Sequence, residues 1–255
     1  MRETLSSKKA LVITGAIGLA LIGALLVYGI LVTPARQPYR DALAQYENTN
    51  TALSRTSISL NASSASESEF NNGIAAVRDA LKSLETENKA LGEEAVLRDG
   101  GGEKLYVAYD KDITRYVAYN RDVVSSMELL RPVLIQCAPK ANSTAVTGED
   151  ADRMSNCAEG VSGATDAPDE DYAQLASDLE GIYETLASVF ARMAAAGEGD
   201  QGYQALVEEW QTANEAYSEA SATFSKNVQA QRKAILGTSS ANDLKAYLSD
   251  HSRVF

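Results

Sequence analysis

The chain has 255 residues, of which 45% are hydrophobic, and this is enough for one large or two small packed domains. Its formal net charge is −12 at pH 7. Three of the 23 basic and one of the 35 acidic residues precede residue 34, so the remainder carries 20 bases, 34 acids and a net charge of −14. Such a negative field argues against nucleic acid as a partner and against lying flat on an anionic membrane.

The segment 10–33 predicts a transmembrane anchor. Its apolar run, from Ala10 to Val32, has 23 residues and no charge. As a helix it would be about 34 Å long, which is enough to cross a hydrocarbon core of about 30 Å. A cleaved secretory signal is the alternative, but its apolar region is about 7–15 residues long and ends at a small-x-small site. The following TPARQPYR offers no such site, so we expect an uncleaved anchor behind a short cytoplasmic tail, 1–9.

Charge around this anchor predicts its orientation. Three basic residues precede the span and two follow it, a small positive-inside bias: Arg2, Lys8 and Lys9 against Arg36 and Arg40. The sequence contains no second apolar run of this length. A short basic tail before one long span is typical of a signal-anchor. We therefore expect a single-pass plasma-membrane protein with a cytoplasmic N-terminus and an extracytoplasmic bulk.

The rest of the chain is predicted to be helical. The expected fold is all-α: the transmembrane helix, a membrane-proximal helix and linker over 34–66, and an antiparallel helical bundle or coiled coil of about five helices over 67–255. No alternating β-branched run indicates a strand. Ser66 and Glu69 fit a capping box at a helix start. A heptad seam follows, made of Phe70, Ile74, Val77, Leu81, Leu84, Asn88, Leu91 and Ala95.

Further apolar faces extend over 106–134, 172–193 and 203–235, and a short last helix is expected around 242–249. The glycine-rich segments 99–102 and 197–202 are predicted to stop helices and to join antiparallel neighbours. Alternate helices would then leave and return to the membrane. This places the cysteine loop and the C-terminus together at the end far from the bilayer.

Cys137 and Cys157 are the two cysteines of the chain and enclose a polar segment. Outside the cytoplasm, such a pair most simply forms a disulfide. Zinc would need two more ligands, and the sequence has one histidine, His251. A redox pair usually has the closer Cys-x-x-Cys spacing. We predict a stabilising bridge that closes a loop over 137–157.

Four tyrosines lie on one predicted helix, namely Tyr106, Tyr109, Tyr116 and Tyr119. They could form an aromatic platform for a ligand or a partner helix, or they could fill the bundle core, as aromatic stripes at helical spacing usually do. The first three lie on the apolar face. Tyr119 does not, and is therefore a possible interaction residue.

The acidic cluster in the cysteine loop supplies the other possible interaction residues, Glu149, Asp150 and Asp152. Their spacing does not match a calcium-binding loop, so no metal is expected. No nucleophile and base can be paired, because His251 is close to the C-terminus, where disorder is common.

These patterns predict a non-enzymatic envelope or cell-surface scaffold that needs no cofactor. Its expected partners are the membrane, another protein, or a second copy bound through helical faces; the seam 70–95 is the best intermolecular coiled-coil candidate. The alternative is a ligand-binding or sensory module whose groove is lined by the tyrosine-rich helix 105–120.

Overall fold

The computed structural model describes residues 35–56, 66–98, 100–137, 146–196, 199 and 201–253. The predicted tail 1–9, the predicted span 10–33 and most of the predicted linker lie outside these residues. Within them every regular element is a helix, and no strand is present. The all-helical prediction is therefore confirmed. None of the helices in the described part of the chain is long and apolar enough to cross a bilayer.

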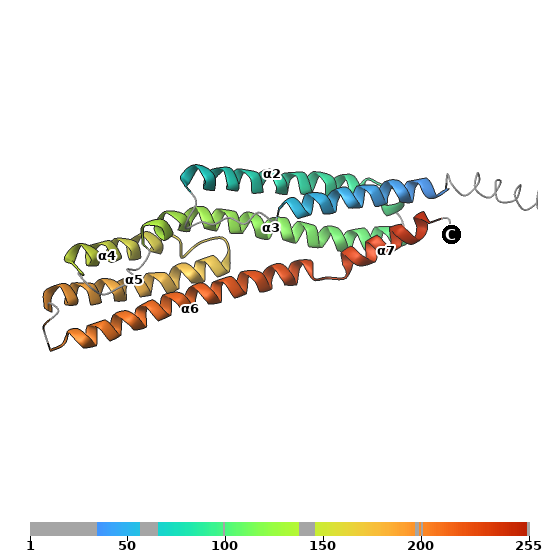
Figure 1. Ribbon diagram of the computed structural model, residues 1–255. Coiled ribbons are helices and arrows are strands. Elements are labelled where there is room, and N and C mark those ends of the chain that lie inside the picture. The colour runs from blue at the N-terminus through green and yellow to red at the C-terminus, as the bar shows by residue number, and fades with distance from the viewer. Residues whose placement is uncertain are drawn as a thin grey trace, which may run out of the picture. The chain divides into compact units, whose positions relative to one another are not determined.

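The helices follow one another in a simple order along the chain (Figure 1). After a helix over residues 35–55 come α2 (Glu67–Gly92) and a short 3-10 turn, η1 (Ala95–Leu97). The longest helix, α3 (Gly100–Gln136), runs through Pro132 without a break. It is followed by α4 (Gly148–Ser162), α5 (Glu170–Ala196), α6 (Tyr203–Leu236) and α7 (Ser240–Ser252).

The chain divides into two units, each with its own core. Unit 1 contains, among the described residues, 35–51, 86–98, 100–110 and 239–253. Unit 2 contains 52–56, 66–85, 111–137, 146–196, 199 and 201–238. Helices α2 and α3 each contribute residues to both units.

In unit 2 the helices pack as antiparallel pairs. Two ion pairs join α2 to α3, Arg78 to Glu128 and Glu85 to Arg121. The residue number rises along α2 while it falls along α3, so the two helices are antiparallel. Helices α5 and α6 are also antiparallel, as two aromatic contacts show: Tyr172 packs on Phe224 and Tyr183 on Tyr217. The apolar face predicted for α5 is buried throughout: Tyr172, Leu175, Leu179, Ile182, Leu186, Val189 and Met193.

The predicted heptad seam of α2 is buried within the chain itself. Seven of its eight members are buried, from Phe70 to Leu91, while Ala95 lies beyond the helix and is exposed. The guanidinium of Arg131 lies 4.3 Å from the centre of the Phe70 ring. Because this face is covered by the chain's own residues, it is not free to form the predicted intermolecular coiled coil.

The predicted capping box at the start of α2 is confirmed. The backbone N–H of Ser66 donates to Oε2 of Glu69 over 2.9 Å, and the backbone N–H of Glu69 donates to Oγ of Ser66 over 3.3 Å. The bond from the Ser66 N–H, and a second from the Ser66 hydroxyl to the same Oε2 over 2.8 Å, lower the pKa of the Glu69 carboxyl because they stabilise its charged form. Four residues of sequence were sufficient to predict where this helix begins.

Unit 1 contains the C-terminal helix, against the expectation from sequence. Helix 35–55 and α7 lie side by side and antiparallel (Figure 1): Nε of Arg40 donates to the Ser252 carbonyl over 3.4 Å, and the Tyr46 hydroxyl donates to the Ala241 carbonyl over 2.9 Å. The end of α7 therefore lies beside the start of helix 35–55, in a different unit from the two cysteines. His251 is held in α7 and is not in a disordered tail.

The glycine-rich segment after α2 also differs from its prediction. The helix stops at Gly92, before η1, and all three glycines belong to the first turn of α3. Gly100 has a φ of 65°, a left-handed conformation that glycine adopts without strain. At Gly102 a Cβ atom would fall onto the Val96 carbonyl oxygen, so the chain needs a residue without a side chain there.

Alanine substitutions at Gly101 and Gly102 should show which of these two positions requires a glycine. Gly102→Ala should destabilise the protein by about 1–3 kcal/mol, because the added methyl overlaps backbone. Gly101→Ala is the matched control: its Cβ would come within 3.8 Å of the Tyr247 ring, an ordinary contact, and alanine favours helix by up to about 1 kcal/mol. Urea unfolding of the full chain in detergent, followed by circular dichroism, measures both. Equal stability of the two variants would contradict the packing at Val96.

Candidate functional site

The predicted disulfide is present and joins two helices. Cys137 directly follows the last residue of α3, and Cys157 lies in the middle of α4. Their Cα atoms are 5.7 Å apart and 20 residues apart in sequence. In the chain-entropy model, closing a loop of this length stabilises a fold by about 3 kcal/mol. The bridge therefore fixes the end of α3 against α4.

Half of the predicted polar loop is helical, which corrects the expectation of a loop over 137–157. Thr147 and Asp150 form a capping box, in which Oδ2 of Asp150 accepts the Thr147 backbone N–H over 2.9 Å. Apolar residues then recur at helical spacing and are buried: Ala151, Met154, Cys157, Ala158 and Val161. The acidic residues at the start favour a helix N-terminus because they face its positive dipole end.

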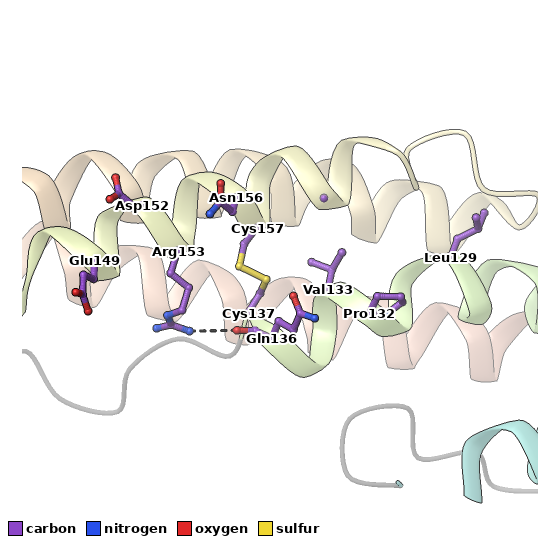
Figure 2. Close-up of a pocket in the computed structure, with 11 residues that line it drawn as sticks. Leu129, Pro132, Val133, Gln136, Cys137, Glu149, Asp152, Arg153, Asn156 and Cys157 are labelled. Carbon is purple, nitrogen blue, oxygen red and sulfur yellow. Dashed lines mark hydrogen bonds between the residues drawn. A yellow bond between two sulfur atoms is a disulfide. The ribbon is translucent and has the colours of Figure 1, made fainter. Parts of the chain in front are cut away.

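A surface groove of about 570 Å³ lies between α3 and α4, beside the disulfide (Figure 2). One side is a stripe of α3 at spacings of three and four residues, and the other is a matching stripe of α4. The first stripe contains Leu129, Pro132, Val133 and Gln136; the second contains Glu149, Asp152, Arg153, Asn156 and Gly160. Both cysteines also line the groove.

Two further contacts fix the width of this groove. A Cβ at Gly160 would lie 3.3 Å from Cγ2 of Val133, so glycine allows a close approach of α4 to α3. Nη1 of Arg153 donates to the backbone carbonyl of Gln136 over 3.3 Å, as the dashed line in Figure 2 shows. The groove is thus bounded by a covalent bond, a backbone hydrogen bond and a tight helix contact.

The groove combines an exposed apolar side with acidic side chains. Leu129 is 48% exposed although it is a large hydrophobic residue. At the other end of the groove, beyond the disulfide, Glu149 and Asp152 project from exposed positions of α4 (Figure 2). Exposed apolar surface rimmed by polar groups is typical of sites that bind another molecule. Glu149 and Asp152 therefore remain predicted contact residues, while Asp150 is buried and caps its own helix.

Tyr119, the remaining predicted interaction residue, lies inside unit 2. Its side chain is 7% exposed, and burial, together with the nearby Asp169 carboxylate, raises the pKa of its hydroxyl to about 12. Asp169 is 5% exposed and accepts the backbone N–H groups of Asp171 and Tyr172 over 3.1 and 3.2 Å. These bonds supply an acceptor to backbone N–H groups at the start of α5, so Asp169 acts as the N-terminal cap of this helix.

The other three tyrosines of the stripe also pack internally. Tyr109 and Tyr116 are buried, and the half-buried Tyr106 donates its hydroxyl to the Asn88 carbonyl over 2.9 Å. In unit 1 the Tyr109 ring contacts Tyr46 at 5.6 Å between centroids. In unit 2 the Tyr116 hydroxyl is 2.7 Å from that of Thr56. The structure thus gives these side chains the core positions that one of the two sequence interpretations assigned to them.

Sequence reasoning missed the apolar side of the groove. Leu129 and Pro132 lie within the helix predicted over 106–134 but were not predicted to bind anything, because their exposure depends on where α4 packs. A recoverable signal existed in TGEDADRMSNCAEGV, whose capping-box residues and apolar spacing predict α4. Within the described ranges, no three side chains of His, Cys, Asp or Glu lie together as a metal site requires.

The chain matches no known protein family, no curated protein and no solved structure. Any function therefore has to be argued from the geometry of its own residues.

Substitution of Asp169 should reveal what its buried charge does. Burial is the main reason that the pKa of this carboxyl is raised. Because the folded pKa lies above the unfolded one, its contribution is fully present below the unfolded pKa and is lost as the pH rises through the folded pKa. Asp169→Asn keeps the cap without the charge, so it should be more stable than the wild type at pH 7, with the difference vanishing near pH 3–4.

Asp169→Ala is the matched control for the cap. It should be less stable than Asp169→Asn by about 1 kcal/mol, because the N–H groups of the first turn of α5 lose their acceptor. Thermal melting of the three proteins across this pH range measures both effects. A wild type that is more stable than Asp169→Asn at pH 7 would contradict the proposed cost of the buried charge.

Proposed function

We propose that the protein is a membrane-anchored, non-enzymatic interaction protein that holds a helical bundle outside the cytoplasm and binds a partner protein in the groove beside Cys137–Cys157. The observation that carries this proposal is the combination of an apolar stripe on α3 with acidic side chains on α4 in one groove. The partner segment that fits it presents an apolar side chain at one end and basic residues at the other.

The apolar contact would supply most of the affinity. Covering an exposed leucine side chain stabilises a complex by about 1.5–3 kcal/mol. Leu129 and Pro132 both lie on exposed turns of α3. Pro132 has no N–H, so the Glu128 carbonyl receives no hydrogen bond from it within the helix. A partner donor can use this acceptor.

Charge would add selectivity and speed of association. The chain is acidic overall, and Glu149 and Asp152 add two carboxylates at the groove. Opposite charge on a partner accelerates encounter and disfavours other acidic proteins, an effect that salt screens. A basic partner segment is therefore favoured.

The rigid attachment of α4 supports binding to a preformed site. The disulfide, the contact of Gly160 with Val133 and the hydrogen bond from Arg153 all hold α4 against α3. A groove whose walls are already fixed loses little conformational freedom on binding. This favours a recognition surface over a flexible linker.

The membrane anchor is the second part of the proposal. Residues 10–33 are apolar over a length that suits a bilayer, and the described helix that follows starts at residue 35. The orientation with an extracytoplasmic bundle is supported by the disulfide, since such bonds persist mainly in oxidising compartments. A plasma-membrane, single-pass arrangement with a cytoplasmic N-terminus follows.

The alternative ligand-binding module has weaker support. It requires an open groove along the tyrosine-rich helix 105–120, whereas Tyr109, Tyr116 and Tyr119 are buried among neighbouring helices. Of the exposed large apolar residues, Leu129 lines the groove beside the disulfide, whereas Val107, on helix 105–120, lies outside it. A partner protein therefore remains the favoured occupant.

Site-specific photo-cross-linking tests the groove. A benzoylphenylalanine at Asn156, an exposed lining residue, should give a discrete adduct in cells that express the full chain. Leu129→Glu should reduce that adduct at least about tenfold, the equivalent of about 1.4 kcal/mol of lost contact. Benzoylphenylalanine at Ser155, exposed on the same helix but outside the lining, is the matched control position.

Val107→Glu controls for the loss of an exposed apolar residue elsewhere, since Val107 is 58% exposed and lies outside the groove. This variant should keep the adduct at Asn156. The proposal fails if positions 155 and 156 give the same adducts, or if Leu129→Glu and Val107→Glu behave alike.

Thiol labelling of intact cells tests the topology. A membrane-impermeant maleimide should label Glu47→Cys, on the exposed side of helix 35–55, without lysis. Ser6→Cys, in the predicted cytoplasmic tail, should be labelled only after lysis. Cys137 and Cys157 should stay unlabelled in both cases unless the protein is first reduced, because they are bonded to each other. The reverse pattern at positions 6 and 47 would place the bundle in the cytoplasm and contradict the proposal.

A further inference from the structure

An aromatic cluster joins the start of helix 35–55 to the end of α7 in unit 1. The Tyr39 and His251 rings are stacked, with centroids 5.0 Å apart and planes inclined by 21°. Tyr247 lies 4.4 Å from His251 and packs edge-on against Tyr39 at 6.0 Å. We call Tyr39, Tyr247 and His251 the aromatic cluster. His251 is exposed and the two tyrosines are half-buried, so the rings reach the surface of the unit.

The first turn of α3 supports the aromatic cluster. A Cβ at Gly102 would lie 3.2 Å from the Tyr247 ring, and one at Gly101 would lie 3.8 Å from it, so this ring rests directly on the first turn of α3. The bond from Nε of Arg40 to the Ser252 carbonyl ties the two outer helices together beside the rings. The aromatic surface is therefore preformed.

Charge near the cluster is opposite to that of the chain as a whole. The segments 35–41 and 245–253 together contain four bases and two acids, whereas the chain has a net charge of −12. The bases are Arg36, Arg40, Lys245 and Arg253, and the acids are Asp41 and Asp250. Local positive charge of this kind attracts phosphate groups.

The aromatic cluster lies close in sequence to the proposed membrane anchor, which suggests the bilayer surface as its partner. Helix 35–55 begins two residues after the apolar segment 10–33, and Tyr39 lies four residues, or about 6 Å, further along this helix. The headgroup region of a bilayer extends about 5–8 Å beyond the hydrocarbon core on each side. Tyrosines at this depth, with arginines beside them, have the composition of the aromatic belt of membrane proteins.

We propose that the aromatic cluster and its flanking arginines form a contact surface for phospholipid headgroups, which seats unit 1 on the bilayer. This inference rests on the proposed anchor at 10–33. Tyr39, Tyr247 and His251 present flat rings with polar edges to the interface, and the arginines bind lipid phosphates. The acidic remainder of the chain is repelled from the same surface.

Depth-dependent quenching of tryptophan fluorescence tests the contact. The full chain, with its one tryptophan removed by Trp210→Phe, is reconstituted in vesicles of phosphatidylcholine and phosphatidylglycerol. Tyr247→Trp or Tyr39→Trp then reports on the cluster. Phosphatidylcholine with a nitroxide on its headgroup should quench either tryptophan at least about twofold more than a tryptophan at position 47.

Glu47→Trp is the matched control, since position 47 is exposed on the same helix about 12 Å beyond Tyr39. Carbonate extraction of the same vesicles reports insertion separately. A chain that resists extraction but shows equal quenching at positions 39, 47 and 247 overturns the lipid contact and leaves the anchor intact. A chain that carbonate removes overturns the anchor, and the contact with it.

A second set of variants keeps the native tryptophan and tests the flanking arginines. Replacement of Arg36 and Arg253 by glutamine should at least halve the protection of the backbone amides at 39–46 from hydrogen exchange in vesicles relative to the wild type. In detergent without phospholipid the same variant should match the wild type. A loss of protection in both media would show a purely structural role and contradict the contact.

Discussion

The covalent bond between Cys137 and Cys157 determines what the rest of unit 2 can do. It holds the Cα atom of Cys137, at the end of α3, 5.7 Å from that of Cys157 in the middle of α4. The neighbouring residues of α4 are therefore held close to α3 as well. A contribution of about 3 kcal/mol is large beside a typical total stability of 5–15 kcal/mol. Helix α4 has only 15 residues and follows a polar segment, so without this bond it would have no covalent link to α3 other than that segment. With this bond, the stripe of α3 that contains Leu129 and the stripe of α4 that contains Asp152 line a single groove.

Three buried or half-buried polar side chains satisfy helix ends and helix contacts inside the units. Asp169 caps α5, Asp150 caps α4, and the Asn88 side chain donates to Asp110 over 2.6 Å within unit 1. Each lies where a helix end or a seam would otherwise leave hydrogen-bonding groups unsatisfied, which is costly away from water. The raised pKa values of the buried tyrosines have the same origin, since burial disfavours their charged forms. Perturbed groups in this chain therefore mark architecture.

Much of the fold could be predicted from sequence because its strongest signals are local. The heptad seam, the Ser66–Glu69 capping box and the apolar face of α5 depend on residues three or four positions apart, and all are found as predicted. The disulfide followed from counting cysteines. By contrast, α4 was taken for a loop because its acidic first turn resembled a solvated charge cluster.

The rest could not be predicted because it depends on contacts between distant segments. Gly102 was interpreted as a helix stop, yet what requires a glycine there is the Val96 carbonyl. The C-terminus was placed with the cysteines, whereas a stacked pair of rings, Tyr39 and His251, places it beside residue 40. The same limit applies to the groove: Glu149 and Asp152 were found from composition, but Leu129 was identified only once α4 had a position.

The ring that the disulfide closes also determines how the protein responds to a cut. Residues 138–156 lie between the two bonded cysteines, so a protease that cleaves one peptide bond there leaves both fragments covalently joined. The part of the chain from Cys157 onward, which includes α5, α6 and α7, then stays attached to everything that precedes Cys137. One such cut therefore does not release the part of the chain that follows Cys157. Release requires a second event, reduction, which is rare wherever the bond was able to form.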